Sequence, residues 1–215
     1  MHPRRPTRGR LFLRQAQTTR RGRDTTAVPA ELAFRTGGAT LPVPNMAADA
    51  HIIRDATVDD LPAIVAIYNA TIPGRMVTAD LSPVTVESRR DWFSAHQQPS
   101  RPLWVLSDPS GAVRAWLSFD TFYPRAAYDG TAMIAIYVDP GSRRSGLGRR
   151  ILRTALERAP SLGLHTLLGY IFGHNEPSLR LFAAHGFERW AHLPRVAVLD
   201  GVERDLLIVG RRVAP

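Results

Sequence analysis

Residues 131–159, TAMIAIYVDPGSRRSGLGRRILRTALERA, decide the fold of this chain. Their first part, residues 133–138, is apolar and rich in β-branched side chains, which predicts a buried strand. The sequence DPGS at 139–142 ends that strand, because proline and glycine interrupt regular structure. A new apolar pattern with helical spacing begins at Leu147. The stretch therefore predicts a strand, a glycine-containing turn and a helix.

The turn between this strand and helix has the pattern R-x-x-G-x-G over residues 143–148. Glycine lets the backbone approach a ligand closely, and the free N–H groups of a helix N-terminus attract negative charge. The pattern is not the G-x-G-x-x-G of dinucleotide folds, and no G-K-[ST] follows for a nucleoside triphosphate. On its own the pattern is more typical of plain turn chemistry than of an anion site, and a second motif is needed to favour the anion site.

A second motif lies downstream, where Asn175-Glu176-Pro177-Ser178 is followed by Gly186-Phe187. Together the two motifs resemble motifs A and B of the GCN5-related N-acetyltransferase superfamily. In that family the first loop holds the pyrophosphate of acetyl-CoA, and the asparagine reaches the pantetheine arm. The run IIRDATVDDLPAIVAIYNATI, from residue 52, resembles the start of the phosphinothricin acetyltransferase branch.

The resemblance implies a set of site residues. Backbone groups at Tyr137 and Val138 are expected to contact the acetyl group and to stabilise the oxyanion. The residues expected to bind acetyl-CoA are Tyr137, Val138, Arg143, Arg144, Ser145, Gly146, Leu147, Gly148, Asn175 and Ser178. Arg75 and Tyr128 are expected to contact the acceptor amine, although a surface arginine is an equal alternative for Arg75. No metal ligand is expected.

Two positions depart from the family pattern. Relatives commonly carry a glutamate where this chain has Met133, and a tyrosine or histidine where it has Phe182. Neither residue can transfer a proton, so both usual acid–base positions are apolar. The candidates for a substitute acting through water are Asp129, Tyr128, Tyr170 and His174, and Asp129 is the predicted base. Acid–base help is typically worth ~10²–10⁴-fold, so we expect slower turnover rather than none.

Hydrophobic periodicity predicts the order β-α-α-β-β-β-α-β-α-β-β over residues 51–212. This is the order of the acetyltransferase fold, so we expect an α/β domain with a mixed central sheet flanked by helices. The second helix is expected around residues 84–96. The last two strands are expected to form a hairpin that turns at Asp200-Gly201.

The positive charge of the chain is concentrated at its beginning. The chain has 215 residues and a formal charge of +9, and all 28 basic residues are arginine. Residues 1–45 hold 9 of these arginines against two acidic residues. This segment lacks periodicity, so we predict it to be disordered. Because Met46 precedes the first strand closely, we hypothesise a mis-assigned upstream start or a dispensable extension, with the domain spanning 46–215.

The composition excludes several classes of site. The chain has no cysteine, which excludes disulfides, thiolate metal sites and a cysteine nucleophile. No apolar run approaches the ~18 residues of a membrane span. We therefore predict a cytoplasmic protein that binds neither membrane nor nucleic acid, with RNA or DNA binding through the arginine-rich segment as a minor alternative. A homodimer is left open.

The predicted function is the transfer of an acetyl group from acetyl-CoA to the primary amine of a small molecule. The resemblance points to an amino acid or an analogue such as phosphinothricin or methionine sulfoximine. The alternatives are acetylation of a peptide or protein amine, and a CoA-binding module impaired by Met133 and Phe182. The sequence does not identify the acceptor, because loops form its pocket.

Overall fold

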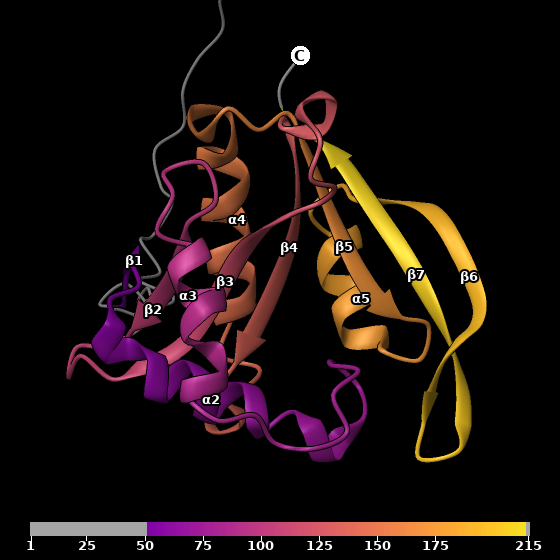
Figure 1. The fold of residues 1–215 in the computed structure, drawn as a ribbon, viewed down its shortest axis with the longest axis horizontal. Helices are drawn as coiled ribbons and strands as arrows, with labels where there is room; N and C mark the ends of the chain where they lie inside the picture. Colours follow the sequence, from indigo (N-terminus) through magenta and orange to yellow (C-terminus); the bar gives the residue numbers. More distant parts are fainter. Residues whose placement is uncertain (1–50, 214–215) are drawn as a thin grey trace, which may run out of the picture. The chain divides into compact units, whose positions relative to one another are not determined.

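The computed structural model describes residues 51–213 (Figure 1). The strands are β1 (Ile52–Asp55), β2 (Leu103–Ser107), β3 (Val113–Thr121), β4 (Thr131–Val138), β5 (Thr166–Phe172), β6 (Glu188–Leu199) and β7 (Val202–Arg212). The α-helices are α2 (Leu61–Asn69), α3 (Arg90–Ala95), α4 (Leu147–Arg158) and α5 (Glu176–Ala183). This order is the one expected from the sequence. The predictions for residues 1–45 and for Met46 lie outside the described residues.

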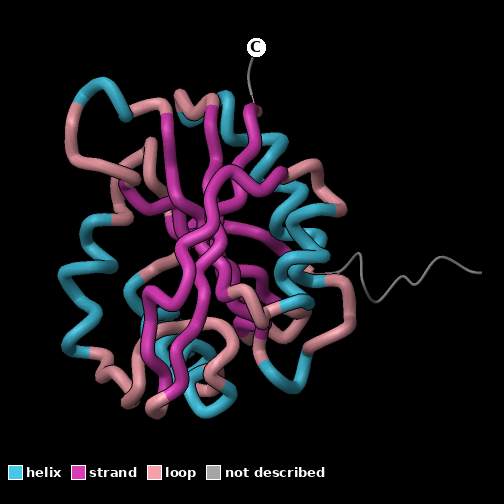
Figure 2. Tube along the Cα trace, turned by 90° about the vertical axis from the view of Figure 1, so that its right-hand side faces the viewer, coloured by secondary structure: helices cyan, strands magenta, loops and turns pink. Residues whose placement is uncertain are grey.

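The seven strands form one mixed sheet in the order β1-β2-β3-β4-β5-β7-β6. Among the described strands, β4 and β5 are the parallel pair and the other neighbours are antiparallel. Helices cover both faces of the sheet (Figure 2). The predicted α/β architecture with a mixed central sheet is therefore confirmed.

Each face of the sheet has its own hydrophobic core. On one face α4 packs against β3 and β4, and its residues Ile151, Leu152 and Ala155 are fully buried. On the other face α2 and α3 pack against Val105 and Trp116. Because side chains alternate along a strand, β4 places successive residues in the two cores. This alternation sends Met133, Ala135 and Tyr137 to the face that carries α2 and α3.

The second helix is shorter than expected from the sequence. A 3-10 turn at Glu87–Arg89 precedes α3, and the segment before it is not helical. The side chain of Asn69 binds both backbone groups of Val84, at 2.8 Å and 2.9 Å. Those groups are then not available for a helical ladder, and Thr85 and Ser88 exchange amide–hydroxyl bonds where the helical turns begin.

The hairpin of β6 and β7 turns at Asp200 and Gly201, as expected. Both residues have positive φ, 49° and 79°, which suits the tight turn that joins antiparallel strands. Among the helices of residues 51–213, none has the length and apolar character needed to cross a membrane.

Candidate active site

The candidate active site lies where β4 and β5 separate. The two strands pair only through Thr131–Met133 and Thr166–Leu168. Beyond these residues β4 remains paired with β3, and β5 remains paired with β7. The two halves of the sheet therefore diverge towards the C-terminal ends of β4 and β5 (Figure 1). Ligands of open α/β sheets bind at such ends, and a cavity of about 470 Å³ lies here.

Several elements enclose this cavity. Residues 133–137 of β4 form one wall, and residues 170–172 of β5 form another. Residues 77–79, from the segment after α2, also line the cavity. Three further lining residues come from the α5 segment: Asn175, Ser178 and Phe182. Both apolar positions that depart from the family pattern, Met133 and Phe182, therefore lie in the cavity wall.

The N-terminus of α4 lies just beyond the end of β4. Gly146 is the N-cap and has φ 85°, a left-handed conformation that favours glycine. The amide of Arg150 donates to the Gly146 carbonyl at 3.0 Å, and the amides before it precede the helical ladder. A Cβ built on Gly146 would meet no atom within 4 Å. The helix end is therefore open and suited to an anion.

The residues expected to bind acetyl-CoA divide between two places. Tyr137, Asn175 and Ser178 line the cavity, whereas residues 143–148 lie outside its lining, at the start of α4. Gly148 is closely packed, because a Cβ there would lie 3.4 Å from Leu181 Cδ2 and 3.7 Å from Val138 Cγ2. These contacts join the first turn of α4 to β4 and to α5, which borders the cavity.

The side chain of Asn175 forms hydrogen bonds within the protein. Its side-chain amide donates to the Met76 carbonyl at 2.8 Å, and its side-chain oxygen accepts from the Ser178 amide at 3.2 Å. The neighbouring His174 places Nε2 2.8 Å from the Arg75 carbonyl. The loop before α5 therefore holds the segment after α2, whose residues 77–79 line the cavity.

A second cavity, of about 160 Å³, lies on the α2 and α3 face of the sheet. Its walls are largely aromatic: the Tyr137 ring stacks on Trp116 with centroids 4.3 Å apart, and Tyr68 lies 5.1 Å from Tyr137. Burial raises the pKa of Tyr137 well above its ordinary value. The Arg89 guanidinium lies 4.7 Å from the centre of the Tyr68 ring and 3.0 Å from Asp80 Oδ2.

Asp120 belongs to both cavities. It lies opposite Met133 in the pairing of β3 with β4. Its Oδ2 accepts from Ser118 Oγ at 2.6 Å, and its Oδ1 accepts from Trp92 Nε1 at 3.4 Å. His96 Nε2 lies 3.2 Å from the same Oδ1, in a bent geometry. No sequence motif singles out Asp120, because only the strand register brings it to the site.

The contacts of Asp120 and His96 shift the pKa of each group. Burial alone would raise the pKa of Asp120, but its contact with His96 and the hydrogen bond from Ser118 outweigh burial and lower it. Burial alone would lower the pKa of His96, but its contacts with Asp120 and with the Trp92 carbonyl raise it. Each shift favours the charged form of the group.

Arg75 lines neither cavity and binds other parts of the protein. Its Nε lies 2.7 Å from Asp200 Oδ2, and its Nη1 donates to the carbonyls of Ile72 and Leu81. These bonds connect the segment after α2 with the turn between β6 and β7. The lining of neither cavity includes Arg75, so its contact with the acceptor stays a prediction.

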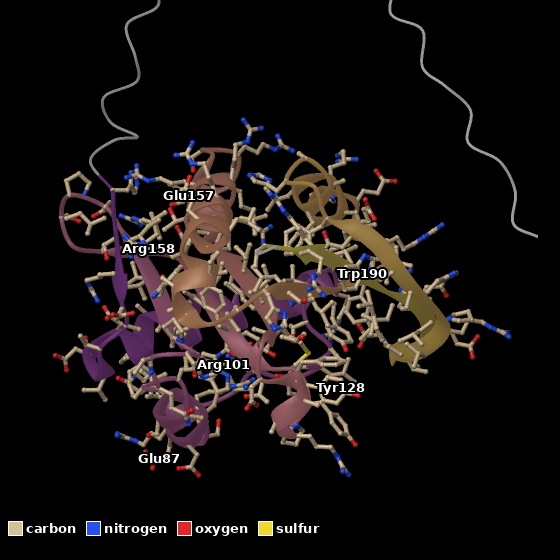
Figure 3. All side chains as sticks on the ribbon, turned by 90° about the horizontal axis from the view of Figure 1, so that it is seen from above. Glu87, Arg101, Tyr128, Glu157, Arg158 and Trp190 are labelled. Atoms are coloured by element: carbon tan, nitrogen blue, oxygen red, sulfur yellow. The ribbon has the colours of Figure 1, made fainter. Side chains whose placement is uncertain are left out.

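Tyr128 lies on an exposed turn (Figure 3). Asp129 beside it is also exposed, and neither residue lines either cavity. Tyr128 is 43% exposed and contacts the rings of Phe122 and Tyr123. Arg101 fixes the turn by donating to the Asp129 carbonyl at 2.7 Å. The roles of Tyr128 in acceptor binding and of Asp129 as a base also stay predictions.

A model of the acetyltransferase (GNAT) family matches residues 64–187, which include the separating strands, α4 and α5. The chain belongs to the GNAT family. The family assignment agrees with the mixed sheet, the open N-terminus of α4 and the cavity between β4 and β5.

Similar proteins give the activity within the family. The chain is 52% identical over 162 residues to the Bacillus subtilis protein named "Putative phosphinothricin acetyltransferase YwnH", covering 75% of this chain and 99% of that protein. It is 34% identical over 163 residues to the L-methionine sulfoximine/L-methionine sulfone acetyltransferase of Pseudomonas paraeruginosa, covering 76% and 95%.

A similar protein of the GNAT superfamily has been solved with acetyl-CoA bound. The phosphinothricin acetyltransferase of Sinorhizobium meliloti, solved in complex with acetyl-CoA, is 26% identical, with a TM-score of 0.72 over 76% of this chain and 88% of that one. The chain is thus an acetyltransferase with the GNAT fold that acts on the amine of a small molecule. The alternatives of a protein acetyltransferase and an impaired CoA-binding module are not favoured.

Proposed function

We propose that this GNAT enzyme transfers the acetyl group of acetyl-CoA to the α-amine of an amino acid or of an analogue of the methionine sulfoximine or phosphinothricin type. The observation that carries the proposal is that one small cavity is lined by both a carboxylate, Asp120, and a guanidinium, Arg89. A carboxylate attracts an ammonium group, and a guanidinium pairs with a carboxylate or phosphinate. Free amino acids carry both of these groups on one small molecule.

The expected path of acetyl-CoA follows the separation of β4 and β5. The N-terminus of α4 is suited to the pyrophosphate, since its amides are open and Gly146 leaves room for a close approach. The pantetheine arm would then pass Asn175 and Ser178 into the larger cavity. Arg143 and Arg144, beside this helix end, are the predicted contacts with phosphate oxygens.

The reaction itself requires positioning more than covalent help from the protein. The amine attacks the thioester carbonyl directly once both substrates are held at the separation of the strands. The β4 backbone near Tyr137 and Val138 is the predicted source of the N–H group that stabilises the oxyanion. Within residues 51–213 no group of three or more acidic or histidine side chains could hold a metal.

Arg89 is the residue we assign to the acidic group of the acceptor. It lies at the wall of the smaller cavity, over the Tyr68 ring and beside the Asp80 carboxylate. Side chains held by such contacts lose little further freedom when they bind a ligand. The position of Arg89 in a cavity wall distinguishes it from Arg75, whose guanidinium binds Asp200 and two carbonyls.

The proposal is tested by an acceptor panel with detection of released CoA thiol. The panel contains amino acids, methionine sulfoximine, phosphinothricin, simple amines without an acidic group, and short peptides. We expect the highest kcat/KM for a compound that carries both an α-amine and an acidic group. A clear preference for peptides, or for amines without an acidic group, would contradict the proposal.

We propose further that two copies associate through β6, which is an edge strand of the sheet. Apolar side chains are exposed along it: Val196 and Val198 are each 58% exposed, and Trp190 (Figure 3) is 47% exposed. An exposed apolar edge strand is a template for association. Light scattering should give a dimer mass for the native chain and a monomer mass for Val198→Arg. A monomer mass for the native chain would reject the dimer.

Two further predictions from the sequence accompany this function. We expect a chain of residues 46–215 to retain the activity of the full chain, because the family match lies within that range. A cytoplasmic location also remains a prediction. Loss of activity on removal of residues 1–45 would show that this segment is needed.

A further inference from the structure

We propose that Asp120, supported by His96, accepts the proton of the acceptor ammonium in place of the missing glutamate at position 133. The inference rests on the proposed function, since it concerns the same amine and the same cavity. It assigns the proton transfer to a residue of β3 and a residue next to α3, rather than to β4 or to the exposed turn at Asp129.

The strand register places Asp120 beside position 133. Asp120 and Met133 are direct partners in the antiparallel pairing of β3 with β4. Directly opposed residues on antiparallel strands have Cβ atoms about 4.5–5.5 Å apart and lie on the same face. A carboxylate at 120 therefore reaches nearly the same space as a carboxylate at 133. The Asp120 side chain is 28% exposed, and it lines both cavities.

The hydrogen bonds of His96 prepare it to take a proton. Its Nδ1 lies 2.8 Å from the Trp92 carbonyl, which can only accept, so Nδ1 carries a hydrogen. In a neutral imidazole Nε2 is then an acceptor, and it faces Asp120 Oδ1 at 3.2 Å. Two acceptors facing each other repel. A proton delivered to this pair relieves the repulsion, and the His96 side chain, 5% exposed, is shielded from water.

The proposed sequence of proton transfers balances. One proton leaves the acceptor ammonium for the Asp120 carboxylate and passes to His96 Nε2, which leaves a neutral amine. The amine nitrogen forms a bond to the thioester carbon, and the carbon–sulfur bond breaks as the intermediate collapses. The second proton lost from nitrogen goes to the departing thiolate and gives CoA thiol. His96 returns its proton to solvent before the next turnover.

The other ionisable groups near this pair have different partners. Arg89 is a cation held by Asp80, and the Tyr68 hydroxyl donates to Asp80 Oδ2 at 2.5 Å. Burial raises the pKa of Tyr68 and of Tyr137, so both hydroxyls keep their protons at neutral pH. Arg89, Tyr68 and Tyr137 are therefore not acceptors for this proton, which leaves the adjacent Asp120 and His96 to take it.

The test compares Asp120→Asn with the matched control Asp91→Asn in the full chain. Asp91 is an exposed carboxylate on α3 that lines neither cavity. Asparagine at 120 can keep its oxygen towards Trp92 and donate its amide to the Ser118 hydroxyl, which can also accept, so the fold and acetyl-CoA binding should survive. We expect kcat/KM at pH 7 to fall by ~10²–10⁴-fold in Asp120→Asn, which is the usual range for general base help, and to stay within about twofold in Asp91→Asn.

The pH profile separates proton transfer from a structural role. In the native enzyme kcat/KM should rise with pH as His96 loses its proton, with a midpoint above the ordinary histidine pKa of about 6.5. In His96→Gln this limb should disappear, while the acetyl-CoA dissociation constant should not change. If Asp120→Asn does not fold, the pH profile of His96→Gln tests the proposal alone. A rise of kcat/KM with pH that is the same as in the native enzyme would overturn it.

Relocation of the carboxylate gives a further check. The double variant Asp120→Asn/Met133→Glu should have a kcat/KM at least about tenfold higher than Asp120→Asn alone, because it returns a carboxylate to the same space. A structural role for Asp120 predicts no recovery. If the native enzyme acetylates no amine in the panel, the proposed function fails. If it is active and Asp120→Asn matches it at every pH, the proposed function stands and the role of Asp120 is overturned.

Discussion

The helices α4 and α5 begin after the two strands that separate, but their N-termini differ. The N-cap of α5 is Asn175, whose side-chain oxygen accepts from the Ser178 amide. The N-cap of α4 is Gly146, which has no side chain to bind the helix amides. A helix end that is capped by its own chain has fewer groups to offer a ligand. The open end is therefore suited to an anion, and the capped end serves as a wall.

This difference extends to the two sides of the cavity. The proposed cofactor side depends on backbone groups of one continuous segment, from β4 through the loop to α4. The proposed acceptor side depends on side chains from α2, α3, β3 and β4, and Asn175 and Asp200 hold the segment that follows α2. Changes in the first region should act on acetyl-CoA, and changes in the second should act on the amine.

The largest effect is expected for Gly146→Val. Valine at φ 85° is strained and adds branched carbon atoms where the pyrophosphate backbone contacts are expected. The dissociation constant for acetyl-CoA, measured by calorimetry, should rise by ~100-fold or more, which corresponds to about 2.8 kcal/mol.

The matched control for this change is Gly111→Val. Gly111 has φ 87°, also meets no atom within 4 Å, and lies in the turn between β2 and β3. It should lose similar stability but bind acetyl-CoA normally. Normal binding by a folded Gly146→Val protein would remove α4 from the cofactor site.

Asn175→Ala tests the capped end. The change leaves the Met76 carbonyl and the Ser178 amide without their partner, so the free energy of unfolding should fall by about 1–3 kcal/mol. The acetyl-CoA dissociation constant should rise tenfold or less, and the acceptor KM should rise more, because the segment carrying Met76 closes the acceptor side. Urea unfolding, calorimetry and steady-state kinetics measure the three quantities.

A second substitution at the same position separates the two bonds of Asn175. Asn175→Asp keeps an acceptor for the Ser178 amide but loses the group that donates to the Met76 carbonyl. This variant should keep the cap on α5, but it should lose stability at the Met76 carbonyl, which then faces a carboxylate oxygen, and it should still raise the acceptor KM. An acetyl-CoA dissociation constant raised about a hundredfold by either change would show that Asn175 binds the cofactor directly, because a neutral hydrogen bond contributes only about 0.5–1.5 kcal/mol.

The same contrast explains what the sequence could predict. The strand, glycine turn and helix of the cofactor side lie within residues 131–159, so local patterns were enough to place them. The element order and the hairpin turn also depend on local signals, and both are confirmed. The second helix was too long in the prediction, because the long-range bonds from Asn69 to Val84 leave no local trace.

The acceptor side could not be predicted in the same way. The contact between Asp120 and Met133 depends on the register of β3 and β4, which a long connection does not fix. Arg75 is predicted to contact the acceptor, and the structure pairs it with Asp200, which is 125 residues away in the sequence. Sites formed by side chains from distant segments require the tertiary structure.

Arg89→Ala and Arg75→Ala sharpen the comparison within the acceptor side. Arg89 lines the smaller cavity, so its loss should raise the acceptor KM about tenfold, near the low end of a hydrogen bond to a charged group. Arg75 binds Asp200 instead, so its loss should change the acceptor KM by less than about threefold, since exposed ion pairs contribute little. The reverse order of effects would support the predicted contact of Arg75 with the acceptor and contradict the assignment of Arg89.

The smallest effect on stability is expected at the start of a third helix, α2, where a charged side chain binds the backbone. Asp60 precedes α2, and its carboxylate binds Arg54 at 2.6 and 2.8 Å and the Thr57 amide at 2.8 Å. The bond with Arg54 outweighs the effect of burial and lowers the pKa of Asp60. A lowered folded-state pKa gives stability above the unfolded value of about 3.9, and this stability is lost as the pH falls through the folded value.

Asp60→Asn should therefore destabilise the protein by about 0.5–1 kcal/mol at pH 7, since Arg54 is partly exposed and asparagine can still accept from the Thr57 amide. The difference in the free energy of unfolding should shrink as the pH falls below about 4, because the native carboxylate then becomes protonated. Urea unfolding at pH 7, 5, 4 and 3 measures it, with the exposed Asp59→Asn as the control. A difference that stays constant down to pH 3 would mean that the neutral bonds of Asp60, and not its charge, close this helix start.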